Sequence, residues 1–446
     1  MSAPSLIVSG FGTGAGKTAL TLGLVRALAR HGVRASTLKI GMDPVDPDLL
    51  RRASGRECAN IDSWGMRLDT LSGLIDQAGQ GADVTLIDGA GGLYDFDICG
   101  MGSTADIAAM FDIPVILAVD TSHCGSSLVA MLEGFCRHRG DVEIVGFLFH
   151  GLDEKNNHEE TARLLDDRLP TPVLGWIESG IDPAYRLRGF GPATGANRVM
   201  TDHVIESLGD AVDAHVDLHR LMRLARTPNL ATAFTMPRPL APIGQRIAVA
   251  MDEASSFLMP AITHGWQSMG AEILPFSPLA DEAPDEHADA VYLPDGPIDL
   301  FMPRIASNRT LIRGLHAAAH RDAFIYGEGG GYMMLSEHAF DAQERNHAMA
   351  GLLPVMVSTR APRAAPERIE AELTGISRLG RSGSRFRGCA SRTGQELERR
   401  GDPLFRCHVP GREPIEEQGS RLGTVAGSMV RILDRQMHLG IVRMAS

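Results

Sequence analysis

The stretch GFGTGAGKT at residues 10–18 constrains the fold of this chain more than any other part of the sequence. It follows the apolar run SLIV, which predicts a strand, and it leads into a segment whose leucines recur with helical spacing. A glycine-rich turn between a strand and a helix is the setting of a phosphate-binding loop. The common loop has four residues between its outer glycines, whereas five separate Gly10 from Gly16 here. The sequence therefore predicts an α/β domain with a parallel sheet and a P-loop after its first strand.

The P-loop assigns candidate roles to consecutive residues. Backbone N–H groups of such a loop face the phosphates of a nucleotide, and glycines let the backbone approach them closely. The lysine supplies a point charge, and the hydroxyl group of the next residue ligates Mg²⁺. The predicted nucleotide ligands are Gly12, Thr13, Gly14, Ala15, Gly16, Lys17 and Thr18.

Charged residues also follow the next two predicted strands, in KIGMDPVDPD and LIDGAGGLYD. Ligands of open α/β sheets bind at the carboxyl ends of the strands, so we expect these side chains to converge with Lys17. Aspartate can hold Mg²⁺ or a substrate, and lysine can neutralise a transferring phosphoryl group. Each aspartate can also serve only as a turn or cap residue. The residues are Lys39, Asp43, Asp46, Asp88 and Asp95.

The alternation of strands and helices predicts two α/β domains. The first series runs from residue 5 to about 225, and a second begins with RIAVAMD at 246–252. Between them lies a segment with four prolines and little periodicity, which is typical of a linker. We therefore expect a first α/β domain at 1–226, a linker at 227–245 and a second α/β domain at 246–446.

Charge and composition narrow the classes of partner. The net charge is −12 at pH 7, and aromatic residues make up 5% of the chain. An acidic, aromatic-poor protein is disfavoured as a binder of nucleic acid or of anionic membranes. The sequence has neither an apolar stretch of about 18 residues nor a signal-peptide pattern. Its cysteines show no metal-like spacing, which favours a reducing cytoplasm: Cys58, Cys99, Cys124, Cys136, Cys389 and Cys407.

An arginine-rich stretch occupies residues 359–412. One interpretation is an irregular solvated segment among its glycines, serines and prolines. The other is the wall of a pocket for a polyanionic substrate. The arginines are Arg360, Arg363, Arg368, Arg378, Arg381, Arg385, Arg387 and Arg392.

The segments GTGAGKT, KIGMDPVDP, NIDSW, LIDGAGGLYD, GSTADIA and FSPLADE occur in this order, and with them the chain resembles the cobyrinate or hydrogenobyrinate a,c-diamide synthases. The resemblance implies a P-loop domain like that of dethiobiotin synthetase, followed by a class I glutamine-amidotransferase-like α/β domain. In this family, ATP converts a tetrapyrrole carboxylate to an acyl phosphate, and ammonia from glutamine displaces the phosphate. The implied cofactors are ATP and Mg²⁺, and the implied assembly is a homodimer.

The resemblance also implies roles for individual residues. Lys17 and Lys39 match the phosphate-binding lysines, Asp43 an aspartate important for amidation, and Asp95 the acidic residue of GLYD, so these four are the expected catalytic residues. The expected metal ligands are Thr18, Asp43 and Asp88, the last in place of the usual glutamate. Near the substrate loop, Pro44 replaces a tyrosine and Leu50 a histidine.

The second half departs from the family at its catalytic positions. The stretch IYGEGGGYMML at 325–335 predicts a strand–turn–helix elbow, which usually displays a nucleophile. The family has cysteine in ECGG, whereas Gly329 stands here. Arg431 and Leu433 replace the expected histidines, and the oxyanion loop PGGYPE reads PDGPID. The resemblance therefore implies an inactive glutaminase whose elbow is kept for the fold. The family's GHEFH segment also departs and reads GCASR at 388–392. Cys389 or Cys407 as a substitute nucleophile is the minor alternative.

Three functions remain open from the sequence. The first is an ATP-dependent ligase that amidates a tetrapyrrole or other polycarboxylate with free ammonia, another amine, or ammonia from a separate donor. The second is a nucleotide-dependent module that binds a tetrapyrrole or a protein without amidating it. The third keeps phosphoryl activation but acts on a small acid.

Overall fold

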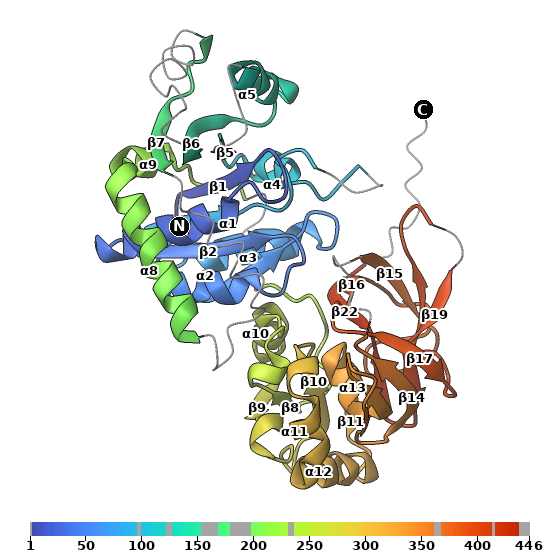
Figure 1. The fold of residues 1–446 in the computed structure, drawn as a ribbon. Coiled ribbons are helices and arrows are strands. Elements are labelled where there is room, and N and C mark those ends of the chain that lie inside the picture. The colour runs from blue at the N-terminus through green and yellow to red at the C-terminus, as the bar shows by residue number, and fades with distance from the viewer. Residues whose placement is uncertain are drawn as a thin grey trace, which may run out of the picture. The chain divides into compact units, whose positions relative to one another are not determined.

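A computed structural model describes residues 2–95, 100–121, 127–152, 168–178, 198–230, 236–360, 367–412 and 415–436 (Figure 1). The chain divides into two compact units. Unit 1 comprises Met1–Trp64 and Leu71–Thr235, and unit 2 comprises Gly65–Thr70 and Met236–Ser446. Three residues of interest, Cys99, Cys124 and Arg363, lie outside the described residues.

Unit 1 is built on a parallel sheet with the strand order β3-β2-β4-β1-β5-β6-β7. Every residue of its central strands β1, β2 and β4 is buried, as expected for a parallel sheet covered on both faces. The predicted parallel sheet is thus confirmed. The strands are β1 Ser5–Gly10, β2 Ala35–Ile40, β3 Cys58–Ile61, β4 Val84–Asp88, β5 Val115–Asp120, β6 Ile144–Leu152 and β7 Val173–Glu178.

The helices of unit 1 pack tightly against this sheet and each other. Gly23 of α1 permits a close approach to α8, because a Cβ atom there would lie 2.7 Å from the carbonyl oxygen of Leu208. The apolar residues of α1, α8 and the sheet join in one core. The helices are α1 Lys17–Arg30, α2 Asp46–Ser54, α3 Leu68–Gly79, α4 Thr104–Phe111, α5 Ser127–His138, α8 Arg198–His215 and α9 Leu218–Leu224.

Unit 2 contains a second α/β layer, which confirms the predicted second α/β domain. Its main sheet has the order β20-β21-β11-β10-β8-β9, with β20 antiparallel and the other pairs parallel. The strands are β8 Arg246–Ala250, β9 Glu272–Phe276, β10 Ala290–Leu293, β11 Phe324–Glu328, β20 Ser420–Leu422 and β21 Val425–Ser428. The α-helices are α10 Pro260–Ser268, α11 Met302–Ser307, α12 Arg309–His320 and α13 Gly330–Leu335, and the 3-10 turns are η1 Glu253–Ser255, η2 Pro278–Ala280 and η3 Ile298–Leu300.

The arginine-rich stretch is not irregular throughout, because its described part contains four β-strands. The strands pair in sheets with the orders β13-β12-β14-β17 and β19-β18-β15-β16-β22, orange to red in Figure 1. Burial alternates along β15, so one face of this strand packs into the core and the other carries charged side chains. The content of glycine and serine, on which the prediction of an irregular segment rested, does not reveal this alternation. The strands are β12 Ser336–Phe340, β13 Asn346–Ala348, β14 Leu353–Ser358, β15 Arg368–Leu373, β16 Arg385–Ala390, β17 Gln395–Arg399, β18 Phe405–His408, β19 Glu416–Gln418 and β22 Val430–Arg435.

Within the described residues, no helix is both long and apolar enough to cross a membrane. The cysteines that the structure describes form no disulfide; they are Cys58, Cys136, Cys389 and Cys407.

Candidate active site

The P-loop lies between β1 and α1, where the sequence places it. Gly14 and Gly16 adopt positive φ angles of 88° and 71°, which non-glycine residues rarely do. A Cβ atom at Gly12 or Gly14 would meet nothing within 4 Å, so the loop leaves open space beside its backbone. The Nζ atom of Lys17 donates to the carbonyl oxygen of Gly12 at 2.7 Å. The lysine therefore curls over the loop that is expected to hold the phosphates.

His150 is a neighbour of the P-loop that the sequence analysis missed. It is buried in β6, and its Nε2 atom lies 2.9 Å from the carbonyl oxygen of Ala15. A Cβ atom at Gly16 would lie 2.6 Å from the same Nε2, so this contact requires glycine there. The rule used for the aspartates, that ligands gather at the carboxyl ends of strands, would have found this histidine.

A buried polar cluster next to the loop joins four of the expected residues. The Thr18 hydroxyl lies 2.9 Å from Asp88 Oδ2 and 3.5 Å from Asp46 Oδ2. The Lys39 ammonium lies 2.6 Å from Asp88 Oδ2 and 3.0 Å from Asp46 Oδ2, and it also donates to the carbonyl oxygen of Gly89. The strand ends of β2 and β4 and the start of α2 thus bring together Thr18, Lys39, Asp46 and Asp88.

The charges of this cluster fit a bound cation. Burial opposes protonation of Lys39, but Asp88 and Asp46 outweigh it and raise the pKa of the lysine, which stays charged at neutral pH. Two carboxylates against one ammonium leave a net negative charge beside the Thr18 hydroxyl, and these oxygens are of the type that Mg²⁺ prefers. The described residues hold no group of three or more His, Cys, Asp or Glu side chains able to bind a metal. A Mg²⁺ ion here would therefore complete its coordination with phosphate and water oxygens.

Asp43 and Asp95 lie on the loops that follow β2 and β4. Oδ1 of Asp43 accepts the N–H groups of Val45 and Asp46 at 2.8 and 3.2 Å, which shapes the entry into α2. Oδ2 of the exposed Asp95 accepts the N–H group of Gly92 at 2.6 Å and closes a turn. Both carboxylates thus have the local turn role that aspartate often takes. Leu50 is fully buried, so the residue at the expected histidine position is part of the core.

In unit 2, the elbow lies between β11 and α13, with Gly329 at its tip. The φ and ψ angles of Gly329 are 49° and −111°, a conformation that favours glycine. A Cβ atom at Gly331 would lie 1.9 Å from the carbonyl oxygen of Leu293, so the helix following the elbow packs against β10 through bare backbone. The predicted elbow geometry is therefore present without a side chain at its tip.

The side chains of Glu328, Tyr292, Tyr326 and Arg431 near the elbow are buried and interact with one another. Burial raises the pKa of Glu328 to about 7, although the hydroxyls of Tyr292 and Tyr326 donate to its carboxyl oxygens at 2.9 and 3.0 Å. Arg431 is buried and close enough to Glu328 to favour its charged form.

The two cysteines proposed as substitute nucleophiles are poorly suited to that role. Burial raises the pKa of Cys389, and it raises the pKa of Cys407 to about 12. The reactive form of cysteine is the thiolate, which an apolar environment disfavours. Both thiols are therefore expected to be inert.

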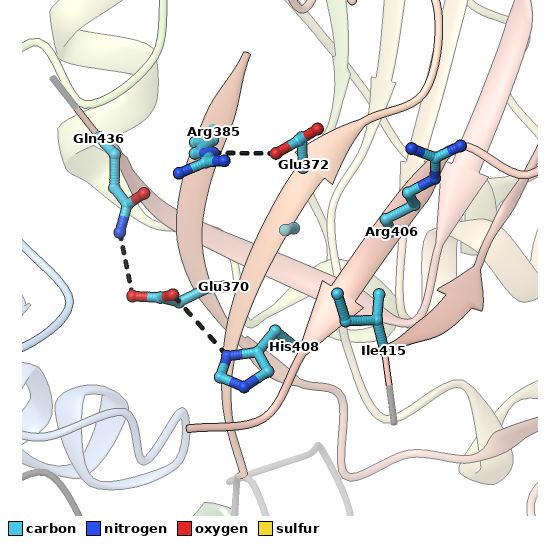
Figure 2. Close-up of a pocket in the computed structure, with 8 residues that line it drawn as sticks. Glu370, Glu372, Arg385, Arg406, His408, Ile415 and Gln436 are labelled. Atoms are coloured by element: carbon cyan, nitrogen blue, oxygen red, sulfur yellow. Dashed lines mark hydrogen bonds and ion pairs between the residues drawn. The ribbon is translucent and has the colours of Figure 1, made fainter. Parts of the chain in front are cut away.

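The sheet β19-β18-β15-β16-β22 carries a pocket of about 250 Å³ on its charged face (Figure 2). Basic side chains lie beside carboxylates in it: Arg385 Nε lies 2.9 Å from Glu372, and the His408 Nδ1 atom lies 3.9 Å from Glu370. Gln436 also donates to Glu370 at 3.1 Å. The pocket has mixed charge, which does not favour the predicted wall for a polyanion.

Known proteins resemble this chain over nearly its whole length. The family of CobB/CobQ-like glutamine amidotransferase domains matches residues 246–433. The hydrogenobyrinate a,c-diamide synthase of Brucella abortus biovar 1 is 36% identical over 427 residues, covering 95% of this chain and 96% of that protein. The enzyme of the same name from Rhodobacter capsulatus is 37% identical over 433 residues, covering 96% and 98%.

Proposed function

The chain belongs to the family of the hydrogenobyrinate a,c-diamide synthases, and on this basis we propose that it amidates side-chain carboxylates of a tetrapyrrole in an ATP-dependent reaction. The observation that carries the proposal is the P-loop with Thr18, Asp88 and Lys39 joined beside it. The reaction site belongs to the segment 1–226, the linker is 227–245, and 246–446 is a glutaminase-like domain without glutaminase activity.

The phosphate-binding groups would act by positioning and charge. ATP supplies the phosphoryl group that turns the substrate carboxylate into an acyl phosphate, a better target for ammonia. Gly12 to Gly16 offer backbone N–H groups to the phosphates, and Lys17 can exchange its bond to the Gly12 carbonyl for a phosphate oxygen. Lys39 neutralises charge that develops on the transferred group. Thr18 and Asp88 are the proposed protein ligands of Mg²⁺, which screens the phosphates.

Asp43 and Asp95 are proposed to face the substrate carboxylate that is amidated. Each lies on a loop at the carboxyl end of a strand, and each has one carboxylate oxygen held by backbone N–H groups. A carboxylate fixed in this way can orient an incoming ammonia molecule. Asp43 also remains a proposed Mg²⁺ ligand, since it lies close in sequence to Asp46 of the cluster.

We propose that the ammonia is not made by this chain. A glutaminase needs a thiolate at the elbow, and Gly329 has no side chain there. Free ammonium, another amine or a separate ammonia donor would supply the nitrogen. We further propose a homodimer that works in the cytoplasm, as the family resemblance implies.

The test is amide formation with purified full-length protein. Hydrogenobyrinate and related tetrapyrrole acids are incubated with ATP and Mg²⁺, together with either ammonium chloride or glutamine, and products are read by mass spectrometry. We expect the mass change of OH to NH₂ with ammonium but not with glutamine. The Lys17→Met variant should lose this activity, while Arg34→Met, which removes an exposed cation paired with Asp83, should retain it.

The alternative outcomes separate the competing functions. Amide formation from glutamine would refute the inactive glutaminase. Tight ATP binding without turnover on any acid would refute the ligase and support the nucleotide-dependent binding module. Turnover on small acids only would refute the tetrapyrrole as substrate.

A further inference from the structure

The space that a side chain at the elbow tip would occupy is already filled. A Cβ atom built on Gly329 would lie 2.1 Å from Asp295 Oδ1, 2.3 Å from its Cγ and 2.7 Å from its Oδ2. Asp295 itself is buried, with 3% of its surface exposed, so it has little room to withdraw. A side chain at position 329 and the carboxyl group of Asp295 therefore exclude each other.

The Asp295 carboxyl group sits in a cradle of donors from separate parts of unit 2. Its Oδ1 atom accepts the N–H group of Gly330 at 2.7 Å and that of Gly296 at 2.8 Å. The Thr393 hydroxyl lies 3.3 Å from the same oxygen and 3.2 Å from the carbonyl oxygen of Gly296. Burial raises the pKa of Asp295, and the positive charge of the buried Arg431 guanidinium offsets only part of that shift.

This arrangement has the composition of a carboxylate-binding site. Two backbone N–H groups that point at one oxygen, with a hydroxyl and a buried cation near them, are the donors that recognise an anionic oxygen. One donor is the N–H group directly after the elbow tip, and the other comes from the loop after β10. In hydrolytic elbows, a pair of this kind holds the oxyanion of a substrate.

We propose that the elbow retains an oxyanion-binding cradle, and that the chain fills it permanently with the side chain of Asp295 in place of an external carboxylate or amide. Asp295 is then a built-in ligand that stabilises unit 2 and excludes glutamine. Removal of its carboxyl group opens a site for a small carboxylate anion. Restoration of cysteine at position 329 alone cannot recreate a nucleophile, because Asp295 occupies the space.

The direct test is chemical rescue of Asp295→Ala in the full-length chain. The substitution removes a carboxylate and leaves a gap of that size, so formate is the probe. We expect the thermal transition of unit 2 to fall in the variant and to recover by at least about 3 °C at formate concentrations well above the dissociation constant. Wild type and the isosteric Asp295→Asn variant, which leave no gap, should not respond, and chloride at equal ionic strength should not rescue.

Equal formate responses in Asp295→Ala, Asp295→Asn and wild type would overturn the proposal. If Asp295→Ala does not accumulate as folded protein, the same titration is run on Asp295→Ser, which keeps a short polar side chain. A soluble yield of Asp295→Ala that appears only when formate is present during refolding would support the proposal.

A double-mutant cycle gives a second, independent readout. Gly329→Ala should destabilise the wild-type background, because the new Cβ meets Asp295, and should cost markedly less in the Asp295→Ala background. Additive losses would refute mutual exclusion. All these experiments measure protein stability, so their outcome does not depend on whether the chain catalyses amidation.

Discussion

Replacement of Lys39 by methionine tests whether the ammonium holds the P-loop cluster together. Methionine has a similar length and removes only the charge and its hydrogen bonds. The lysine and both carboxylates are almost completely buried, with Nζ 2.6 Å from Asp88 and 3.0 Å from Asp46. The variant therefore leaves two buried carboxylates close together without a cation.

The structure sets the size of the effect. Coulomb's law with an effective dielectric constant of about 20 gives roughly 6 kcal/mol of attraction for each of the two ion pairs. Desolvation of the ammonium offsets most of this gain, and removal of one partner of a buried pair costs about 3–5 kcal/mol. We expect Lys39→Met to lower the free energy of unfolding of unit 1 by that amount at pH 7.

The loss of folding stability in Lys39→Met should also be smaller at low pH than at high pH. In the variant, Asp46 and Asp88 lie buried with no cation between them, so protonation of either carboxylate relieves the repulsion in the folded state. The variant then gains stability as pH falls toward the ordinary aspartate range and loses it as pH rises. The raised pKa of Lys39 gives wild type no matching slope at neutral pH, because the lysine is protonated in both states there.

The assay is urea unfolding followed by circular dichroism at pH 5 and pH 8. The matched control is Arg34→Met, which removes an exposed cation 2.7 Å from Asp83 and should change stability little. The double variant of Lys39→Met with Asp88→Asn should regain part of the loss, since one uncompensated charge is gone. The reasoning is refuted if Lys39→Met resembles the Arg34 control, or if its loss is larger at pH 5 than at pH 8.

Three further predictions concern other parts of the chain. Because the folded-state pKa of Glu328 is raised to about 7, wild-type stability should fall as pH rises from about 4.5 to 7, and Glu328→Gln should remove up to about 3 kcal/mol of this dependence in pH-resolved denaturation. Gly331→Ala places a Cβ 1.9 Å from the carbonyl oxygen of Leu293 and should cost about 1–3 kcal/mol, whereas Gly140→Ala, with open space around it, should stay within about 0.5 kcal/mol of wild type in the same urea titration. Ser103→Ala removes one side of the capping box of α4 and should cost about 1 kcal/mol by thermal unfolding, with Ser103→Asn retaining most of the stability.

The candidate site shows how far local reasoning reaches. The P-loop was predictable because a strand, a glycine-rich turn and a helix lie next to each other in sequence, and their order fixes their geometry. The meeting of Lys39 with Asp88 was predictable as a tendency, because parallel strands end at one edge of a sheet. The close contact of Lys39 with Asp46 and the turn roles of Asp43 and Asp95 depend on loop conformations, which strand order does not specify.

The arginine-rich stretch marks the opposite limit. Its composition indicated a solvated loop, yet its described part contains four β-strands, and Arg385 of β16 is the direct cross-strand partner of Glu372 in β15. Cross-strand partners lie far apart in sequence, so composition cannot reveal that an arginine is neutralised.

The amino-acid sequence by itself determined that this chain has a phosphate-binding loop, two α/β domains and an elbow without a nucleophile, because each of these depends on residues adjacent in the chain. Only the tertiary structure decided that Asp295 fills the place of the missing side chain and that His150 lies against the P-loop. These contacts join residues more than thirty and more than a hundred positions apart, respectively, as their hydrogen bonds to Gly330 and Ala15 show. Such distances are set by packing of whole strands and helices, and no local pattern encodes them.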